Sequence, residues 1–135
     1  MNPTKIAIVQ ESCVYLDLKA SVQKALKLID EAANNGANIL VFGETWFSGY
    51  PSWLDYVPHA ARWNHPPVKE VWAQTFDNAM EVNGPEVALL AEAAKKTGVF
   101  LIIGFNEAIR KGRGNGTIYN SILMMISDLE PSPAR

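Results

Sequence analysis

The stretch from Asn38 to Pro51 reads NILVFGETWFSGYP. It begins with an apolar run that ends at Gly43, and a single carboxylate, Glu44, follows before an aromatic-rich turn. An apolar run bounded by turn signals predicts a strand buried on both faces, which is the pattern of a parallel sheet. Ligands of open α/β sheets bind at the carboxyl ends of the strands, so Glu44 is a candidate reactive residue.

We expect the Glu44 side chain to be buried or half-buried, with Trp46, Phe47 and Tyr50 close to it. Burial disfavours the charged form of a carboxyl group, as a general base that works near neutral pH requires. The alternative is a glutamate at the end of a strand that simply points into water.

The residues before this stretch predict a βαβ unit. Lys5 to Glu11 is apolar and β-branched, which predicts a first buried strand. From Asp17 the apolar residues recur three and four positions apart, which predicts an amphipathic helix that ends near Gly36. The strand of Asn38 to Gly43 follows at once, so the two strands should be parallel.

The residues after Gly84 predict a second helix and a third buried strand. Pro85 stands at the first turn of this helix, and Gly98 ends it. The strand Val99 to Phe105 follows, with Glu107 just after it. Since Glu44 also follows a strand, two parallel strands should bring a carboxylate to the same edge of the sheet.

The segment Arg110 to Gly116, RKGRGNG, resembles a phosphate-binding loop but does not open a helix. A strand, Thr117 to Ile126, comes after it, so we expect an antiparallel strand pair and no nucleotide site. The complete prediction is an α/β protein with the order β-α-β-α-β-β. Residues 1–126 are predicted to form one domain, and residues 127–135 an irregular tail.

The bulk composition is that of a globular protein. Hydrophobic residues make up 48% and charged residues 19% of the 135 residues. The formal charge of −2 offers no field that would attract nucleic acid or an anionic membrane surface. A lone cysteine, Cys13, and the absence of a secretory leader or a membrane-span run predict a cytoplasmic protein. Cys13 is expected to be unreactive, since no histidine, lysine or arginine lies near it in the sequence before Lys19.

The least regular segment is Ser52 to Asn83, which we expect to form a loop and short helices that wall a substrate pocket. It contains both histidines, His59 and His65, and the pair Pro66 and Pro67. The spacing of the histidines matches no helix or strand geometry that would face both at one ion. No metal and no cofactor are therefore predicted.

Several separate motifs resemble, in order, the nitrilase branch of the carbon-nitrogen hydrolases. The resemblance runs from about Lys5 to Ile126, and its motifs are QES at Gln10 to Ser12, Glu44 with GYP up to Pro51, NGPE at Asn83 to Glu86, and YNS at Tyr119 to Ser121. The resemblance implies an α-β-β-α sandwich, of which this chain would form part. It also implies self-association, since members of the family commonly pair and assemble further.

The resemblance also implies a chemistry. In the family a cysteine thiolate attacks the carbon of a nitrile or amide, a glutamate acts as general base and acid, and a lysine stabilises the developing charge. Glu44 matches the glutamate, and Tyr50 matches a residue near the pocket. Glu107 lies in a familiar segment and is expected to support the structure rather than to touch substrate.

The family's lysine and cysteine follow the strand that corresponds to Tyr119 to Ile126. Here Ser127 to Arg135 contains no lysine, and Cys13 precedes the glutamate. We therefore expect a truncated form of a nitrilase-like hydrolase, inactive by itself, whose completed substrate would be a small nitrile or amide.

Two other hypotheses remain open. The chain could be a non-catalytic module that forms homo-oligomers, or aggregates, through exposed sheet edges. A nucleotide-binding βαβ domain is the other, and the lack of a glycine-rich loop after the first strand argues against it.

Overall fold

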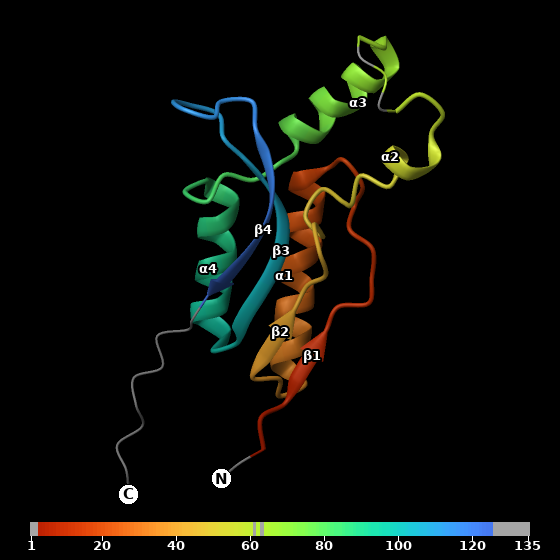
Figure 1. The fold of residues 1–135 in the computed structure, drawn as a ribbon. Coiled ribbons are helices and arrows are strands. Elements are labelled where there is room, and N and C mark those ends of the chain that lie inside the picture. Colours follow the sequence, from red (N-terminus) through yellow and green to blue (C-terminus); the bar gives the residue numbers. More distant parts are fainter. Residues whose placement is uncertain (1–2, 61, 63, 126–135) are drawn as a thin grey trace, which may run out of the picture.

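The computed structural model describes residues 3–60, 62 and 64–125. The predicted tail lies outside these residues. Strands β1 (Ile6–Ile8), β2 (Ile39–Val41), β3 (Phe100–Ala108) and β4 (Ile118–Met125) form a sheet with the order β1-β2-β3-β4. The first three strands are parallel, and β4 runs antiparallel to β3, which confirms the predicted arrangement (Figure 1).

Helix α1 (Leu18–Asn34) has the predicted ends. The carboxylate of Asp17 accepts a hydrogen bond from the backbone N–H of Ala20 at 2.9 Å, which caps the first turn. Gly36 follows the helix with φ of +74°, the left-handed conformation that glycine adopts without strain. One face of α1 is apolar and packs on the sheet.

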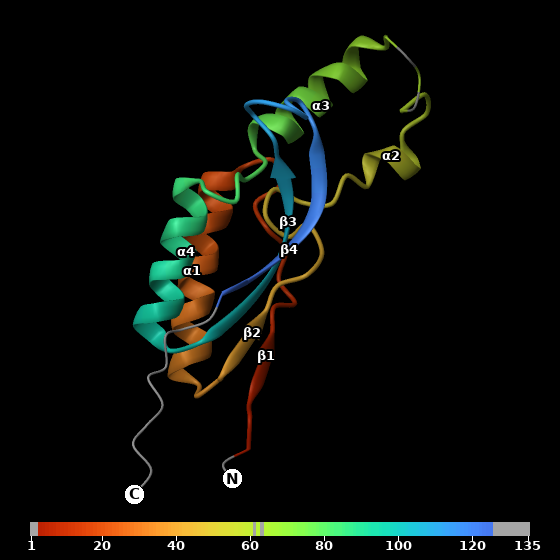
Figure 2. The same cartoon turned by 60° about the vertical axis from the view of Figure 1, so that its left-hand side comes forward.

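Helix α4 (Pro85–Thr97) lies beside α1, and both cover the same face of the sheet (Figure 2). Proline at its first position and Gly98 after its last match the prediction. The core lies between this helix layer and the sheet. Its most deeply buried large side chains are Ile29, Phe47, Met80, Leu90, Leu101, Ile103 and Phe105.

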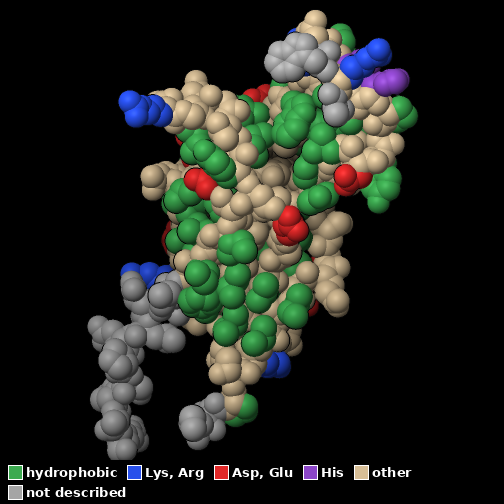
Figure 3. All heavy atoms as spheres, viewed as in Figure 1, with side chains coloured by type: hydrophobic (Ala, Val, Ile, Leu, Met, Phe, Trp, Pro, Cys, Tyr) green, Lys and Arg blue, Asp and Glu red, His purple; other side chains and the backbone are tan. Residues whose placement is uncertain are grey.

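The opposite face of the sheet is uncovered in the described part of the chain, and this corrects the prediction of strands buried on both faces. Ile6 and Ile8 of β1 are 58% and 69% exposed, and Ile122 and Met124 of β4 are 71% and 64% exposed. Their side chains form an apolar patch, which we call the outer face (Figure 3). The physical reason is that α1 and α4 form one layer and shield one side only.

Two further helices, α2 (Trp53–Tyr56) and α3 (Pro66–Asp77), project beyond the carboxyl ends of the parallel strands (Figure 1). Pro66 stands at the start of α3, where a missing N–H costs nothing. The rings of Trp53 and Trp72 meet edge to face at 5.3 Å and join the two helices. This segment therefore has the short helices that the sequence predicted.

The glycine-rich segment after Arg110 connects β3 to β4 and opens no helix, as predicted. Gly112, Gly114 and Gly116 all have positive φ angles, which the reversal of the chain requires. In the described residues no helix combines the length and the apolar character needed to cross a lipid bilayer.

Candidate active site

Glu44 lies directly after β2, at the carboxyl end of the parallel strands, where the sequence placed it. The backbone of this segment crosses very close to β3. A Cβ atom at Gly104 would lie 2.4 Å from the carbonyl oxygen of Gly43 and 2.9 Å from the Cα of Glu44. Only a residue without a side chain allows this approach, so Gly104 helps to position Glu44.

The Glu44 carboxylate is exposed and accepts a hydrogen bond from the side-chain amide of Asn120 on β4 at 2.6 Å. The prediction that the Glu44 side chain is buried or half-buried is therefore wrong in the described part of the chain. The chain turns after Gly43, and this leaves Glu44 on the uncovered side of the sheet while the next residues enter the core. The hydrogen bond nonetheless holds one carboxylate oxygen in a defined place.

The aromatic residues after Glu44 have a different role from the predicted one. Trp46 and Phe47 are buried. The Trp46 ring meets the rings of Phe42 and Phe47 edge to face, and the rings of Phe42 and Phe47 are tilted toward each other. The indole N–H of Trp46 donates to the carbonyl oxygen of Glu11 at 2.7 Å. These two rings stabilise the core and do not surround the carboxylate, whereas Tyr50 is 51% exposed.

Asn106 ties the turn after Glu44 to the sheet. Its side chain is buried, and its amide donates to the carbonyl oxygen of Gly49 at 3.0 Å. Phe47 also forms an isolated parallel bridge with Phe105. The turn that carries Glu44 and Tyr50 is thus held to β3 at Phe47 and at Gly49.

Glu107 lies on β3 and accepts a hydrogen bond from the hydroxyl of Ser121 at 2.6 Å. Glu44 is bound by Asn120, the preceding residue of the same strand. Because successive side chains of a strand point to opposite faces, the two carboxylates lie on opposite faces of the sheet. They reach the same edge, as predicted, but do not converge on one point. The position of Glu107 suits a supporting residue.

Cys13 is half-buried and packs against the core. Loss of water around the thiol raises the pKa of Cys13, and a backbone hydrogen bond and the charge of Lys24 offset this only in part. The thiolate that nucleophilic attack needs is therefore scarce at neutral pH. Lys24 is engaged with Glu11, to which its ammonium group lies at 2.7 Å.

In the part of the chain that the structure describes, no three histidine, cysteine, aspartate or glutamate side chains lie close enough together to hold a metal ion. His59 and His65 lie with ring centroids 6.2 Å apart, but no third histidine, cysteine, aspartate or glutamate joins them. Among the same residues, Asn120 is the one side chain that donates a hydrogen bond to Glu44.

The roles of Gly104, Asn106 and Asn120 were not predicted from the sequence. Asn120 stands within the YNS motif, but the motif alone does not say which strand its amide faces. The missing information was the register: Asn106 pairs with Asn120, and Gly104 pairs with Ile122. Alternation along β4 then places the Asn120 amide on the same face as Glu44.

Comparison with known proteins agrees with these motifs. A family model described as carbon-nitrogen hydrolase matches residues 5–130. An arylacetonitrilase of Aspergillus oryzae is 35% identical over 108 residues, which cover 80% of this chain and 30% of that protein. A nitrilase of Pseudomonas syringae pv. syringae is 36% identical over 108 residues, or 78% of this chain and 30% of that protein. The chain thus spans about a third of the length of these relatives.

The fold has solved counterparts. XC1258 from Xanthomonas campestris, a CN-hydrolase superfamily protein with an arsenic adduct in its active site, superposes with a TM-score of 0.64 at 19% identity. The match covers 95% of this chain and 38% of that one. At this identity the likeness establishes a common fold.

Proposed function

The chain belongs to the carbon-nitrogen hydrolase family, and from this we propose that it contributes the general base, Glu44, to the hydrolysis of a nitrile to a carboxylic acid and ammonia. One observation carries the proposal: the Glu44 carboxylate sits at the carboxyl end of β2 and is oriented by the Asn120 amide at 2.6 Å. One carboxylate oxygen is held, and the other remains available to accept a proton.

The proposed role places two requirements on Glu44. A general base must lie within hydrogen-bond reach of the proton it removes and must keep a defined orientation. The hydrogen bond to Asn120 and the tight crossing at Gly104 supply that orientation, and the exposure of Glu44 leaves it open to a partner group. In the nitrilase chemistry that group is the attacking thiol or water, and Glu44 later returns the proton to the departing nitrogen.

An arylacetonitrile is the substrate class that we favour. Support comes from the relatives named arylacetonitrilase and from the exposed Tyr50 ring on the anchored turn beside Glu44. Trp46 and Phe47 contribute nothing to this choice, since both are committed to the core.

We further propose that the 135 residues alone do not turn over nitriles. Cys13 keeps its proton, and among the described residues no lysine contacts Glu44. Purified chain mixed with phenylacetonitrile should release no ammonia above the buffer rate. Turnover that survives Cys13→Ala and vanishes with Glu44→Gln would contradict this part of the proposal.

The role of Glu44 is tested in a chimera, in which residues 5–125 replace the matching segment of the Pseudomonas syringae nitrilase. We expect the chimera to hydrolyse arylacetonitriles and Glu44→Gln to lower kcat by about 10²–10⁴-fold, the usual contribution of a general base. Glu92→Gln, an equally conservative change at an exposed position of α4, is the matched control and should retain activity. A Glu44→Gln chimera as active as this control would sink the assignment.

A further inference from the structure

β1 lies at an edge of the sheet and has a neighbouring strand on one side only in the described part of the chain. The N–H of Val9 donates to the carbonyl oxygen of Val41 at 2.9 Å, and the carbonyl oxygen of Lys5 accepts from Asn38 at 2.8 Å. Backbone groups of alternate residues point to opposite sides of a strand. The N–H and C=O groups of Ile6, Ile8 and Gln10 therefore face the open side, where another strand can pair with them.

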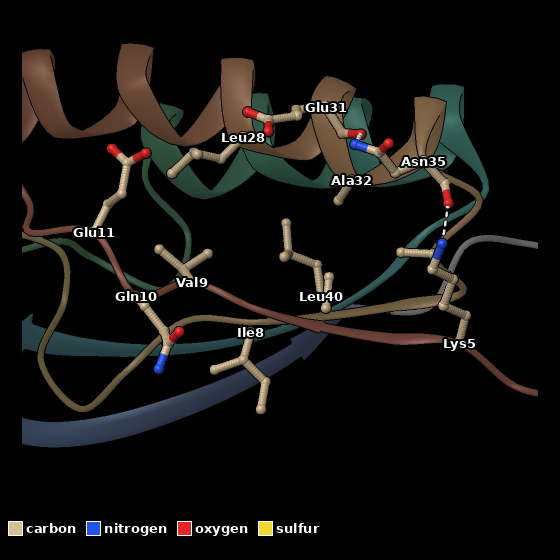
Figure 4. Close-up of a pocket in the computed structure, with 12 residues that line it drawn as sticks. Lys5, Ile8, Val9, Gln10, Glu11, Leu28, Glu31, Ala32, Asn35 and Leu40 are labelled. Carbon is tan, nitrogen blue, oxygen red and sulfur yellow. Dashed lines mark hydrogen bonds between the residues drawn. The ribbon is translucent and has the colours of Figure 1, made fainter.

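An apolar groove runs along this edge, between β1 and the second half of α1 (Figure 4). Leu28 of α1, Val9 of the β1 segment and Leu40 of β2 point into it, whereas Ile8 and Gln10 point to the other side (Figure 4). The cavity amounts to about 230 Å³. A strand added at the edge would bury this groove under alternate side chains while its backbone paired with β1.

The sequence KIAIVQE of Lys5 to Glu11 is complementary to itself in charge. In an antiparallel pairing with its two-fold axis at Ile8, Lys5 lies opposite Glu11, Ile6 opposite Gln10 and Ala7 opposite Val9. An axis at Ala7 would put Lys5 opposite Val9, and an axis at Val9 would put Glu11 opposite Ala7. Only the register centred on Ile8 matches both charges, and it also pairs residues whose free backbone groups face outward.

We propose that the open edge of β1 binds β1 of a second copy of this chain, antiparallel across a two-fold axis at Ile8. The interface is isologous, so each Lys5–Glu11 contact occurs twice. The two sheets become one continuous sheet, and both grooves are covered. This inference does not depend on the proposed function, because no residue of the interface takes part in the chemistry at Glu44.

The charged ends of this interface are positioned within each copy. The Lys5 ammonium donates to the backbone carbonyl of Asn35 at 2.6 Å, which holds it at one end of the groove. Glu11 lies at the other end, where one of its oxygens pairs with Lys24 at 2.7 Å. Both residues remain exposed, so each can meet its counterpart across the axis.

The test is a charge swap followed by sedimentation velocity over a concentration series of the 135-residue chain. The wild type is expected to dimerise. Lys5→Glu and Glu11→Lys should each weaken the dimer by roughly tenfold or more, because each substitution creates two like-charge pairs across the strands. The double variant with both substitutions should dimerise again.

The decisive sample is an equimolar mixture of the Lys5→Glu and Glu11→Lys proteins. In the proposed register a mixed dimer has opposite charges at both contacts, so the mixture should dimerise although each variant alone does not. Loss of the Lys24 or Asn35 contact within a copy is the same alone and in the mixture, so it cannot imitate this result. A mixture that stays monomeric, or single variants that dimerise like the wild type, would overturn the proposal.

Met124→Lys is the matched control, since it places a charge on the outer face away from the β1 edge. Its dimerisation should equal that of the wild type; a monomeric Met124→Lys beside a dimeric Lys5→Glu would assign association to the outer face instead. Amide hydrogen exchange gives a backbone readout. The N–H groups of Ile6, Ile8 and Gln10 should become protected as concentration rises, and exchange that is independent of concentration would contradict strand pairing.

Discussion

Glu44 and Asn120 are 76 positions apart in the sequence and meet through the pairing of β4 with β3. A hydrogen bond to a charged oxygen is stronger than one between neutral groups, but at an exposed position water competes for it. The contact therefore serves orientation more than stability. Asn120 of the YNS motif thus orients Glu44, although the two residues are far apart in the sequence.

The pKa of Cys13 leads to a prediction of how the stability of the folded chain depends on pH. Burial raises the pKa of its thiol above the ordinary 9.0, so the folded chain holds the proton after the unfolded chain has released it. The free energy of unfolding is therefore unaffected by the titration of this thiol below pH 9.0. It falls as the pH rises above 9.0, because the unfolded chain then loses the thiol proton more readily than the folded chain. Burial raises the pKa of Tyr15 as well, and this acts in the same direction.

Urea unfolding at a series of pH values from neutral to strongly alkaline measures this effect. The free energy of unfolding of the wild type should fall above pH 9.0, and Cys13→Ala should remove part of that fall. Ser12→Ala, a neighbouring exposed residue that does not titrate, is the control. Identical curves for Cys13→Ala and wild type would show that the thiol has no part in the pH dependence.

We expect substitutions of Gly104 and Gly43, which lie close together where β3 crosses the Glu44 segment, to differ sharply in their effect on stability. A methyl group at Gly104 would meet the Gly43 carbonyl oxygen at 2.4 Å, so β3 and the Glu44 segment would have to separate. We expect Gly104→Ala to lower the free energy of unfolding by about 1–3 kcal/mol, the usual cost of overpacking. Gly43→Ala is the control, because nothing lies within 4 Å of its added Cβ.

Equilibrium denaturation of the two variants measures these changes, and a chemical-shift comparison of the Asn120 side-chain amide reports on the Glu44 contact. Gly104→Ala should shift that amide signal, and Gly43→Ala should leave it in place. Equal stability of both variants would mean that the close crossing is not a constraint on the fold.

The molecule as a whole has one covered and one uncovered face. α1 and α4 shield one side of the sheet, and the outer face presents Ile6, Ile8, Ile122 and Met124 to solvent (Figure 3). An exposed apolar patch of this kind is typical of a surface that packs against another surface. In the α-β-β-α arrangement that the resemblance implies, a second sheet packs on such a face.

We predict that the outer face binds an apolar dye. Fluorescence of 1-anilinonaphthalene-8-sulfonate should rise strongly with the wild-type chain, and Ile122→Lys combined with Met124→Lys should lower it several-fold. Leu89→Lys on α4, which is 44% exposed on the helix side, is the control and should bind dye like the wild type. Dye binding that persists in the double variant would place the accessible apolar surface elsewhere.

The elements of this protein were predictable because each depends on residues close together in the sequence. Apolar periodicity, the cap at Asp17, the proline at Pro85 and the glycine at Gly98 decide α1, α4 and the adjacent strands with local sterics and hydrogen bonds. The family motifs and the position of Glu44 after β2 belong to the same local information. The sequence could therefore yield the α/β class and a candidate carboxylate.

What surrounds that carboxylate depended on contacts between distant segments. The register of β4 on β3 brings Asn120 to Glu44 and separates Glu107 onto the other face, and no local pattern encodes a register. The same holds for burial: Trp46 and Phe47 entered the core and left Glu44 exposed, because one helix layer shields one side of the sheet. Burial is a property of the assembled layers, so it became known only when the strands and helices were placed together in space.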